Sequence, residues 1–386
     1  MCCKPSRIPL RRLRPLAVAG FAFVIVWGYA LIALNLSFLN PISDAIKSFS
    51  FTDKYYQMMD ERESHAIVIV DLASLRDRGG IALALREIVA CRPAAIGVDC
   101  IFEGEKPDTL ADNALRELAA GCPDIIFSCR LLDEQAGGIG YTKRVHSFFA
   151  DEMPVREGVT NMQRENLYSG IKRELNPGWM LNGGMQPSFV GELVNLYAGK
   201  EMVRVDDKAL KINFSPTDFP VIQPSEIPDS REEIEGRIVL FGDTTDETDM
   251  HYTPIGKMAG VKLLAYATQT VIEGSQVRKL PLWLQVIGSL LLVMLTNAMQ
   301  EAFIRLTSGS KYLFVRHIVG SGYVRGLLTF LWVALFVWAA FICFCLYKLC
   351  LEMAWAIAAI AFLGTSRDFC SMCENYYLSI KERNKK

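Results

Sequence analysis

The pattern of hydrophobic and polar positions contains four long apolar blocks, one near the amino terminus and three after residue 279. The first covers residues 16–36 and has no charged side chain. The others cover residues 280–302, 326–347 and 349–366, and the last is the shortest. Each approaches the roughly 20 residues with which a helix crosses a bilayer. The pattern therefore predicts four transmembrane helices.

A cleaved signal peptide is the alternative interpretation of the first block, because it also begins with basic residues followed by an apolar run. The block is longer than the apolar core of a signal peptide. It ends at Phe38-Leu39-Asn40-Pro41, which is not a small-x-small cleavage site. We therefore interpret residues 16–36 as an uncleaved anchor.

Basic side chains predict the orientation of these helices. Residues 1–15, 303–325 and 367–386 are each rich in Lys and Arg, and such segments stay in the cytoplasm. Both termini and the 303–325 loop are thus expected inside, and residues 37–279 outside. The predicted location is the bacterial inner (cytoplasmic) membrane, with several passes through it.

The segment between the first two blocks alternates short β-branched runs with amphipathic stretches. After a helical stretch over 41–63, strands are predicted over residues 66–71, 94–102 and 124–132, and helices over 80–91, 110–120 and 187–197. Alternating strands and helices are typical of a parallel sheet with right-handed crossovers. The fold class predicted is an α/β extracytoplasmic domain, a mostly parallel sheet with flanking helices, together with four α-helical transmembrane spans.

Two regions of this segment lack a clear period. Residues 133–185 contain several glycines and predict long loops over the carboxyl edge of the sheet. Residues 203–213 predict two short strands on either side of Asp206-Asp207.

A last strand–loop–helix unit covers residues 236–274. The apolar run 238–241 predicts a buried parallel strand that ends at Gly242. The helix that begins near Gly260 has apolar residues at three- and four-residue spacing, which predicts one apolar face. Lys262 and Gln269 are expected on its polar side, available to a second subunit or a ligand.

This unit contains, in order, Phe241-Gly242, Asp249, Tyr252-Thr253-Pro254 and Ala259-Gly260-Val261. In these features it resembles the carboxyl end of a CHASE2 domain, an extracytoplasmic sensory module of bacterial membrane receptors. Upstream segments resemble the family in the same order: Ile67-Val68-Ile69-Val70-Asp71, Ile96-Gly97-Val98-Asp99, Lys211-Ile212-Asn213-Phe214 and Asp218-Phe219-Pro220. The resemblance implies one span, an extracytoplasmic domain and three further spans.

The sequence departs from the family pattern at two places. The family's first strand usually ends in two or three acidic residues, and here only Asp71 is present. The family's last helix usually has polar residues after Gly-Val, and the corresponding residues in this chain are Lys262, Leu264 and Tyr266. A ligand role at those positions is therefore not carried over.

Carboxylates gather where strands end and predict the candidate site. The loop after the last strand contains Asp243, Asp246, Asp249 and His251, together with Glu247. Asp71 and Asp99 end two other strands and are expected at the same edge. Such an edge suits a ligand, or Ca²⁺ or Mg²⁺ held by oxygens. The alternative is that these side chains cap turns and helices. We expect a ligand contact more than a metal, and no cofactor.

Cysteine placement and charge add little to this picture. Cys91 and Cys122, each in a turn before a strand, are the best candidates for a disulfide, although we expect no bridge. Cys100 and Cys129 are expected in core strands. The net charge of −1 gives no reason to expect nucleic acid. No nucleophile, histidine and acid stand at catalytic spacing, and we expect no enzymatic activity.

The sequence favours a membrane-bound sensor that acts through a separate cytoplasmic or membrane effector. Residues 367–386 are too few for an output domain of their own. The alternative is a membrane scaffold or a transport or assembly component, which the spans disfavour because no buried charge or broken helix is expected in them. An extracytoplasmic hydrolase is a third hypothesis. The expected partners are an unknown extracytoplasmic ligand, the effector and the lipid bilayer, with a homodimer left open.

Overall fold

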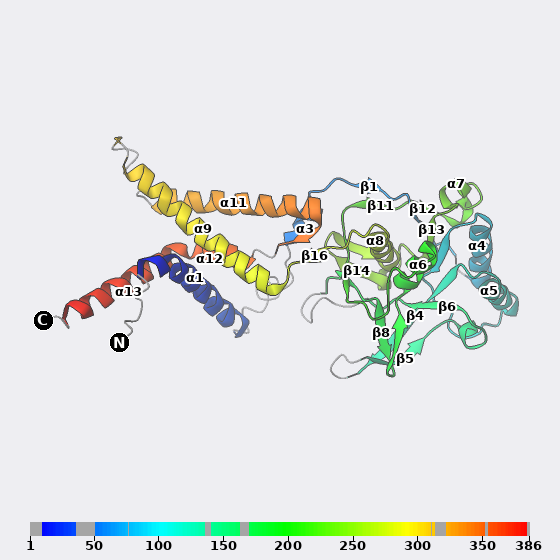
Figure 1. Cartoon of the computed structure of the whole chain (residues 1–386). Helices are drawn as coiled ribbons and strands as arrows, with labels where there is room; N and C mark the ends of the chain where they lie inside the picture. Colours follow the sequence, from blue (N-terminus) through cyan, green and yellow to red (C-terminus); the bar gives the residue numbers. More distant parts are fainter. Residues whose placement is uncertain are drawn as a thin grey trace. The chain divides into compact units, whose positions relative to one another are not determined.

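The computed structural model describes residues 10–35, 51–75, 77–135, 140–162, 170–309, 311–312, 322–351 and 354–383. The chain forms two compact units (Figure 1). One is the continuous stretch Thr52–Val277. The other combines Met1–Phe51 with Arg278–Lys386.

A nine-stranded sheet forms the centre of the first unit. Its parallel part runs in the order β12 (Val221–Ile222), β2 (Ile67–Asp71), β13 (Ile238–Gly242), β3 (Ala95–Val98) and β4 (Ile125–Glu134). β13 comes late in the sequence but lies between β2 and β3, and all five of its residues are buried. This position explains why its sequence is continuously apolar. The predicted α/β domain with a parallel sheet is confirmed.

The sheet continues beyond β4 through a segment that we expected to form loops. β5 (Tyr141–Val145) pairs antiparallel with β4, and β8 (Gly178–Leu181) and β9 (Gly184–Pro187) extend the sheet from it. β6 (Arg156–Val159) also pairs with β4, in parallel. The expectation for residues 133–185 is therefore wrong. Glycine there marks a hairpin turn, since Asn182 and Gly183 between β8 and β9 both have positive φ, as a tight hairpin requires.

The prediction for residues 203–213 is also wrong in part. Only β10 (Leu210–Lys211) is a strand, and it pairs with β7 (Glu174–Leu175) outside the main sheet. Asn195 explains the rest, because its side chain bonds the backbone of Met202 and Val203 in place of a strand partner. Residues 136–139 and 163–169 lie outside the described part of the chain.

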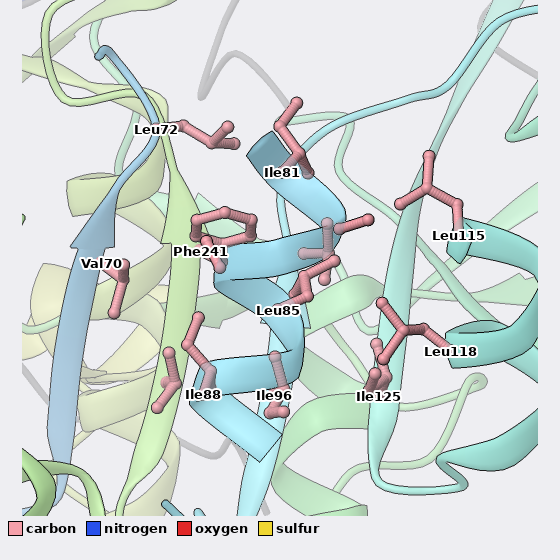
Figure 2. Close-up of a cluster of buried hydrophobic side chains, with 14 of the residues drawn as sticks. Val70, Leu72, Ile81, Leu85, Ile88, Ile96, Leu115, Leu118, Ile125 and Phe241 are labelled. Carbon is pink, nitrogen blue, oxygen red and sulfur yellow. The ribbon is translucent and has the colours of Figure 1, made fainter. Parts of the chain in front are cut away.

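Helices cover both faces of the sheet. α4 (Arg78–Ala90) and α5 (Thr109–Gly121) form a buried cluster with Val70, Ile96 and Phe241 of the strands (Figure 2). α6 (Phe189–Ala198) and α8 (Gly260–Ile272) contact the other face, where Phe189 approaches Gly97 closely. The predicted helices thus exist, with boundaries shifted by one or two residues.

Short elements complete this unit. They are α3 (Phe51–Tyr56), β1 (Arg62–Glu63) paired with β11 (Thr217–Asp218), η2 (Phe148–Asp151), η3 (Pro224–Glu226), α7 (Arg231–Ile234) and η4 (Glu247–Asp249), followed by the hairpin of β14 (Met250–Thr253) and β15 (Gly256–Ala259). Within the stretch 41–63 that we expected to be helical, α3 is the helix described, and residues 36–50 lie outside the described part.

The second unit is mainly helical. It contains α1 (Leu10–Asn35), α9 (Leu282–Ser308), α11 (Gly322–Tyr347), α12 (Ala354–Ala361) and α13 (Leu363–Arg383), with β16 (Arg278–Lys279) paired to β17 (Leu349–Cys350). Ala19, Val293 and Ile360 belong to one buried cluster that joins α1, α9 and α12. Within the described residues, two helices are long and apolar enough to cross a bilayer, Leu282–Thr307 and Gly326–Tyr347. The bent pair Trp355–Ala361 and Leu363–Ile380 would be a third span if the two helices are counted as one. The apolar part of α1, Arg14–Tyr29, is shorter than these candidate spans.

The segment predicted as a fourth span differs from expectation. It begins with β17, and its helix bends by 59° between α12 and α13. On α13, the guanidinium of Arg367 donates a hydrogen bond to the side chain of Gln300, which is 1% exposed, and Gln300 in turn donates to Thr329 at 2.8 Å. The expectation that the spans contain no broken helix is therefore wrong, whereas Arg367 lies one residue beyond the predicted span, in the bent continuation of its helix.

A buried ion pair fastens α4 to α5. Arg78 Nη1 lies 2.6 Å from Asp112 Oδ1, and these side chains are 11% and 2% exposed. The backbone N–H of Lys106 donates to the other carboxylate oxygen. On the same pair of helices, Arg86 and Glu117 form an ion pair whose side chains are 51% and 73% exposed.

We predict that Asp112→Ala lowers the free energy of unfolding by about 3 kcal/mol, because it leaves the Arg78 charge buried and unpaired. Glu117→Ala is the matched control and should cost below about 1 kcal/mol. Urea unfolding of the purified chain measures both, followed by Trp179, the one tryptophan between residues 52 and 277. Equal losses in the two variants would contradict the account of this pair.

Candidate functional site

Three acidic side chains leave the sheet at its carboxyl edge. β2 and β13 pair so that Asp71 lies opposite Gly242, and β13 and β3 pair so that Phe241 lies opposite Val98. Asp71 therefore ends β2, while Asp243 and Asp99 directly follow β13 and β3 at the same edge. Their expected convergence at one edge is confirmed by this register.

Asp71 is 5% exposed, and its carboxylate accepts hydrogen bonds from backbone N–H groups of neighbouring loops. Its Oδ1 accepts hydrogen bonds from the N–H of Ala73 at 3.2 Å and of Thr244 at 3.0 Å. Its Oδ2 accepts from Gln223 Nε2 at 3.4 Å. Asp71 thus connects the loops after β2 and β13, which is the capping role that we weighed against ligand binding.

Asp243 and Asp246 also bond within their own loop. Asp243 Oδ1 accepts from the N–H of Thr245 at 2.7 Å and of Asp246 at 2.9 Å. Asp246 Oδ1 accepts from the hydroxyl of Thr248 at 2.7 Å and from its N–H at 2.8 Å, and these bonds lower the pKa of Asp246. Asp243 is half-buried and Asp246 is exposed, and both hold the turn that precedes η4.

Asp249 lies against the first residue of α8. A Cβ on Gly260 would lie 2.0 Å from Asp249 Oδ2 and 2.8 Å from its Cγ, so the carboxylate occupies the space that any other side chain would need. The amino end of a helix has unpaired N–H groups and a partial positive charge, which favours an anion there. His251 Nε2 lies 3.3 Å from Asp249 Oδ1. Gly260 therefore permits an acid–histidine pair at the start of α8.

Asp99 lies near the Asp249–His251 pair. Burial raises the pKa of Asp99 from its ordinary 3.8 to about 7, and the Asp249 carboxylate acts in the same direction, while Arg130 and His251 oppose it. Two carboxylates that share one region disfavour a second negative charge. Asp99 is therefore a group at this edge whose charge changes near neutral pH, and Asp249 and His251 act on it. We call these three residues the edge triad.

α8 is buried on every side. All residues from Gly260 to Val271 are buried except Lys262, so the prediction of a single apolar face is wrong. Gln269, which we expected to be available to a partner, accepts from Ser64 Oγ at 2.9 Å and donates to Glu273 at 2.5 Å. Apolar spacing alone does not show that polar side chains on the other face have partners inside the protein.

Sequence reasoning missed the residues that hold the far end of α8. Arg62, which precedes β2, donates to Glu273 at 2.8 Å. The N–H of Asn213 donates to Thr270 Oγ1 at 2.9 Å. Nothing in the local sequence pattern links these four positions, because the contacts are formed between distant segments.

Two further expectations concern metals and cysteines. Within the described ranges, no group of three or more His, Cys, Asp or Glu side chains is placed to hold a metal ion. Cys91 and Cys122 are free thiols. Cys129 is buried in β4 as expected, whereas Cys100 lies just after β3 and is half-buried.

Comparison with known proteins gives one match. The family model of the CHASE2 domain matches residues 21–298, which is more than half of the chain. No curated protein and no solved structure matches it.

We predict that Asp99→Asn removes a pH dependence of stability. Because the pKa of Asp99 is raised on folding, its contribution is fully present below pH 3.8 and is lost as the pH rises through about 7. The wild-type chain should therefore lose about 2–3 kcal/mol of unfolding free energy between pH 5 and pH 8.5, and the variant should lose less. Urea unfolding at both pH values measures this. Identical losses in the two proteins would show that Asp99 titrates normally.

Proposed function

We propose, from the premise that this chain belongs to the CHASE2 domain family, that it is a membrane-bound extracytoplasmic sensor whose ligand binds at the edge triad. The observation that carries this proposal is the carboxylate of Asp249 against Gly260, because it places a charged group directly on the first turn of a buried helix. Asp71, Asp243 and Asp246 shape the surrounding loops in this proposal.

The route of the signal is proposed to be α8. The helix ends at Ile272, and only residues 273–281 separate it from α9, a candidate span. A helix buried on all sides shifts as a unit instead of bending smoothly. A ligand that draws Asp249 away from Gly260 would therefore displace the chain leading to α9.

The finer topology belongs to the same proposal. Four spans, with 37–279 outside and both termini in the cytoplasm of a bacterium, agree with the basic segments 1–15, 303–325 and 367–386. The effector is proposed to be a separate protein that contacts the basic 303–325 segment, and no catalytic step is assigned to the chain itself.

A second candidate function is transport or assembly within the membrane. The bend between α12 and α13 and the Arg367–Gln300 hydrogen bond favour it, since broken helices and inward charges occur along substrate paths. A sensor uses the edge triad, whereas a transporter depends on Arg367. Variants at the two places therefore separate the two functions.

We predict that Asp249→Asn abolishes or locks signalling while membrane insertion and folding are retained. The test compares transcript profiles of cells that lack the gene and are complemented with wild type, Asp249→Asn, Arg367→Gln or the control Asp206→Asn, an exposed turn residue. Wild type and control should restore the profile, and Asp249→Asn should not. Full restoration by Asp249→Asn together with failure of Arg367→Gln would favour the transport function.

We predict the topology from cysteine accessibility. Ser230→Cys should react with a membrane-impermeant thiol reagent once the outer barrier is opened, and Ser371→Cys should react only after lysis. The native cysteines are replaced by serine in both proteins. Reaction of Ser371→Cys before lysis would show that the orientation is reversed.

A further inference from the structure

A second group of charged side chains lies between β5, η2 and β6, apart from the edge triad in sequence. It consists of Arg144 on β5, His146 after β5, Asp151 on η2 and Glu157 on β6, and we call it the His146 cluster. The Glu157 side chain is 7% exposed and that of His146 is 23% exposed. Nothing in the proposed sensory site uses these residues.

The imidazole of His146 lies between two carboxylates. Its Nε2 is 3.4 Å from Asp151 Oδ1, and its Nδ1 is 3.6 Å from Glu157 Oε2. A neutral imidazole has one N–H and can donate to only one of them, whereas an imidazolium donates to both. The second proton therefore completes a bridge that the neutral ring leaves half formed.

The hydrogen bonding of the cluster is incomplete in its present arrangement. Within the described part of the chain, the buried atoms His146 Nδ1, Glu157 Oε1 and Arg144 Nε have no hydrogen-bond partner. Arg144 forms an ion pair with Glu157 Oε2 and has Gln186 Oε1 at 3.5 Å from its other terminal nitrogen. A buried acceptor without a donor costs roughly 1–3 kcal/mol, so proton uptake nearby is favoured.

The balance of charges in the cluster also favours proton uptake. With a neutral His146, one cation, Arg144, faces the two carboxylates, and one added proton balances them. Burial raises the pKa of Glu157, which also favours proton uptake, although Arg144 and His146 oppose the shift. Cys129 on β4 is a further titratable neighbour, and burial raises its pKa to about 11, so it stays a neutral thiol.

A protonated His146 that donates to both Asp151 and Glu157 would fasten η2 to the sheet. η2 contains Phe149, which is fully buried and packs edge-on against Phe127 of β4 at 4.9 Å. β6 pairs with the same strand, β4, through Glu157 opposite Phe127. A bond from His146 to both Asp151 and Glu157 therefore connects two elements that already share one strand.

We propose that the His146 cluster is a proton-responsive latch of the extracytoplasmic domain. His146 takes up one proton from solution under mildly acidic conditions, donates to Asp151 and Glu157 together, and holds residues 148–157 against β4. The latch responds to acidity whether or not the edge triad binds a ligand. Its failure and the failure of the sensory proposal are therefore separate outcomes.

The test uses the full chain in lipid nanodiscs with ¹³C-labelled histidine. The chain has four histidines, so the resonance lost in His146→Gln identifies that ring. Glu157→Gln should lower the midpoint of its titration by about one pH unit, because an opposite charge nearby favours the charged ring. Asp151→Asn should lower it by less, since the Asp151 side chain is 77% exposed and screened by solvent. His65→Gln, an exposed histidine, is the control and should leave it unchanged.

Hydrogen exchange of the same proteins tests the structural consequence. After correction for the intrinsic pH dependence, protection of residues 148–157 should rise between pH 7.5 and pH 5.5 in wild type and stay level in His146→Gln. Asp151→Asn retains the buried Arg144–Glu157 pair, so it decides the test if Glu157→Gln does not fold. An unmoved midpoint in the folded variants, or an equal rise in protection without His146, would overturn the latch.

Discussion

Burial of α8 on all sides is the constraint on which the rest of the domain depends. A polar group inside a protein is costly unless it is hydrogen-bonded, and α8 brings Tyr266, Gln269 and Thr270 into the interior. The hydroxyl of Tyr266 donates to the carbonyl of Thr217 at 3.2 Å and accepts from its N–H at 3.1 Å. The hydrogen bonds from these side chains therefore position the segments that cover the helix.

The same constraint connects the two ends of α8. At its start, Gly242 at the end of β13 has space for only a hydrogen beside Val261, and Gly260 has space for only a hydrogen beside Asp249. At its other end, Glu273 is bonded to Arg62, which precedes β2. The chain that enters the domain and the chain that leaves it are thus joined by this ion pair and by the Ser64–Gln269 hydrogen bond. Because α8 is packed at both ends, we expect a displacement at the edge triad to be transmitted along the helix to residues 273–281.

The sequence predicted those parts of the fold whose pattern is local. β2, β3 and β13 are apolar runs ended or followed by Asp or Gly, and their common carboxyl edge follows from parallel pairing. The strands after β4 were missed because they are short, polar on exposed positions and interrupted by glycine.

The candidate site was predicted as a list of acids and not as an arrangement. Asp71, Asp243 and Asp246 differ from Asp99 and Asp249 only in what surrounds them, which depends on loop geometry and on the approach of α8. Gln269 looked available because its partner, Ser64, is distant in sequence. The bend after α12 is likewise set by packing, since residues 354–366 read as one apolar run.

The most direct test of the account is hydrogen exchange in Gly260→Ala. The added methyl group would lie 2.0 Å from Asp249 Oδ2, so it must separate the carboxylate from the helix. Gly121→Ala, where a Cβ meets no atom within 4 Å, is the matched control. If α8 moves as a unit, exchange in Gly260→Ala should change at both ends of the helix, from residue 249 to residues 273–279, and the control should match wild type. A change confined to the first turn of α8 would contradict the claim that the edge triad is coupled to the chain that leads to α9.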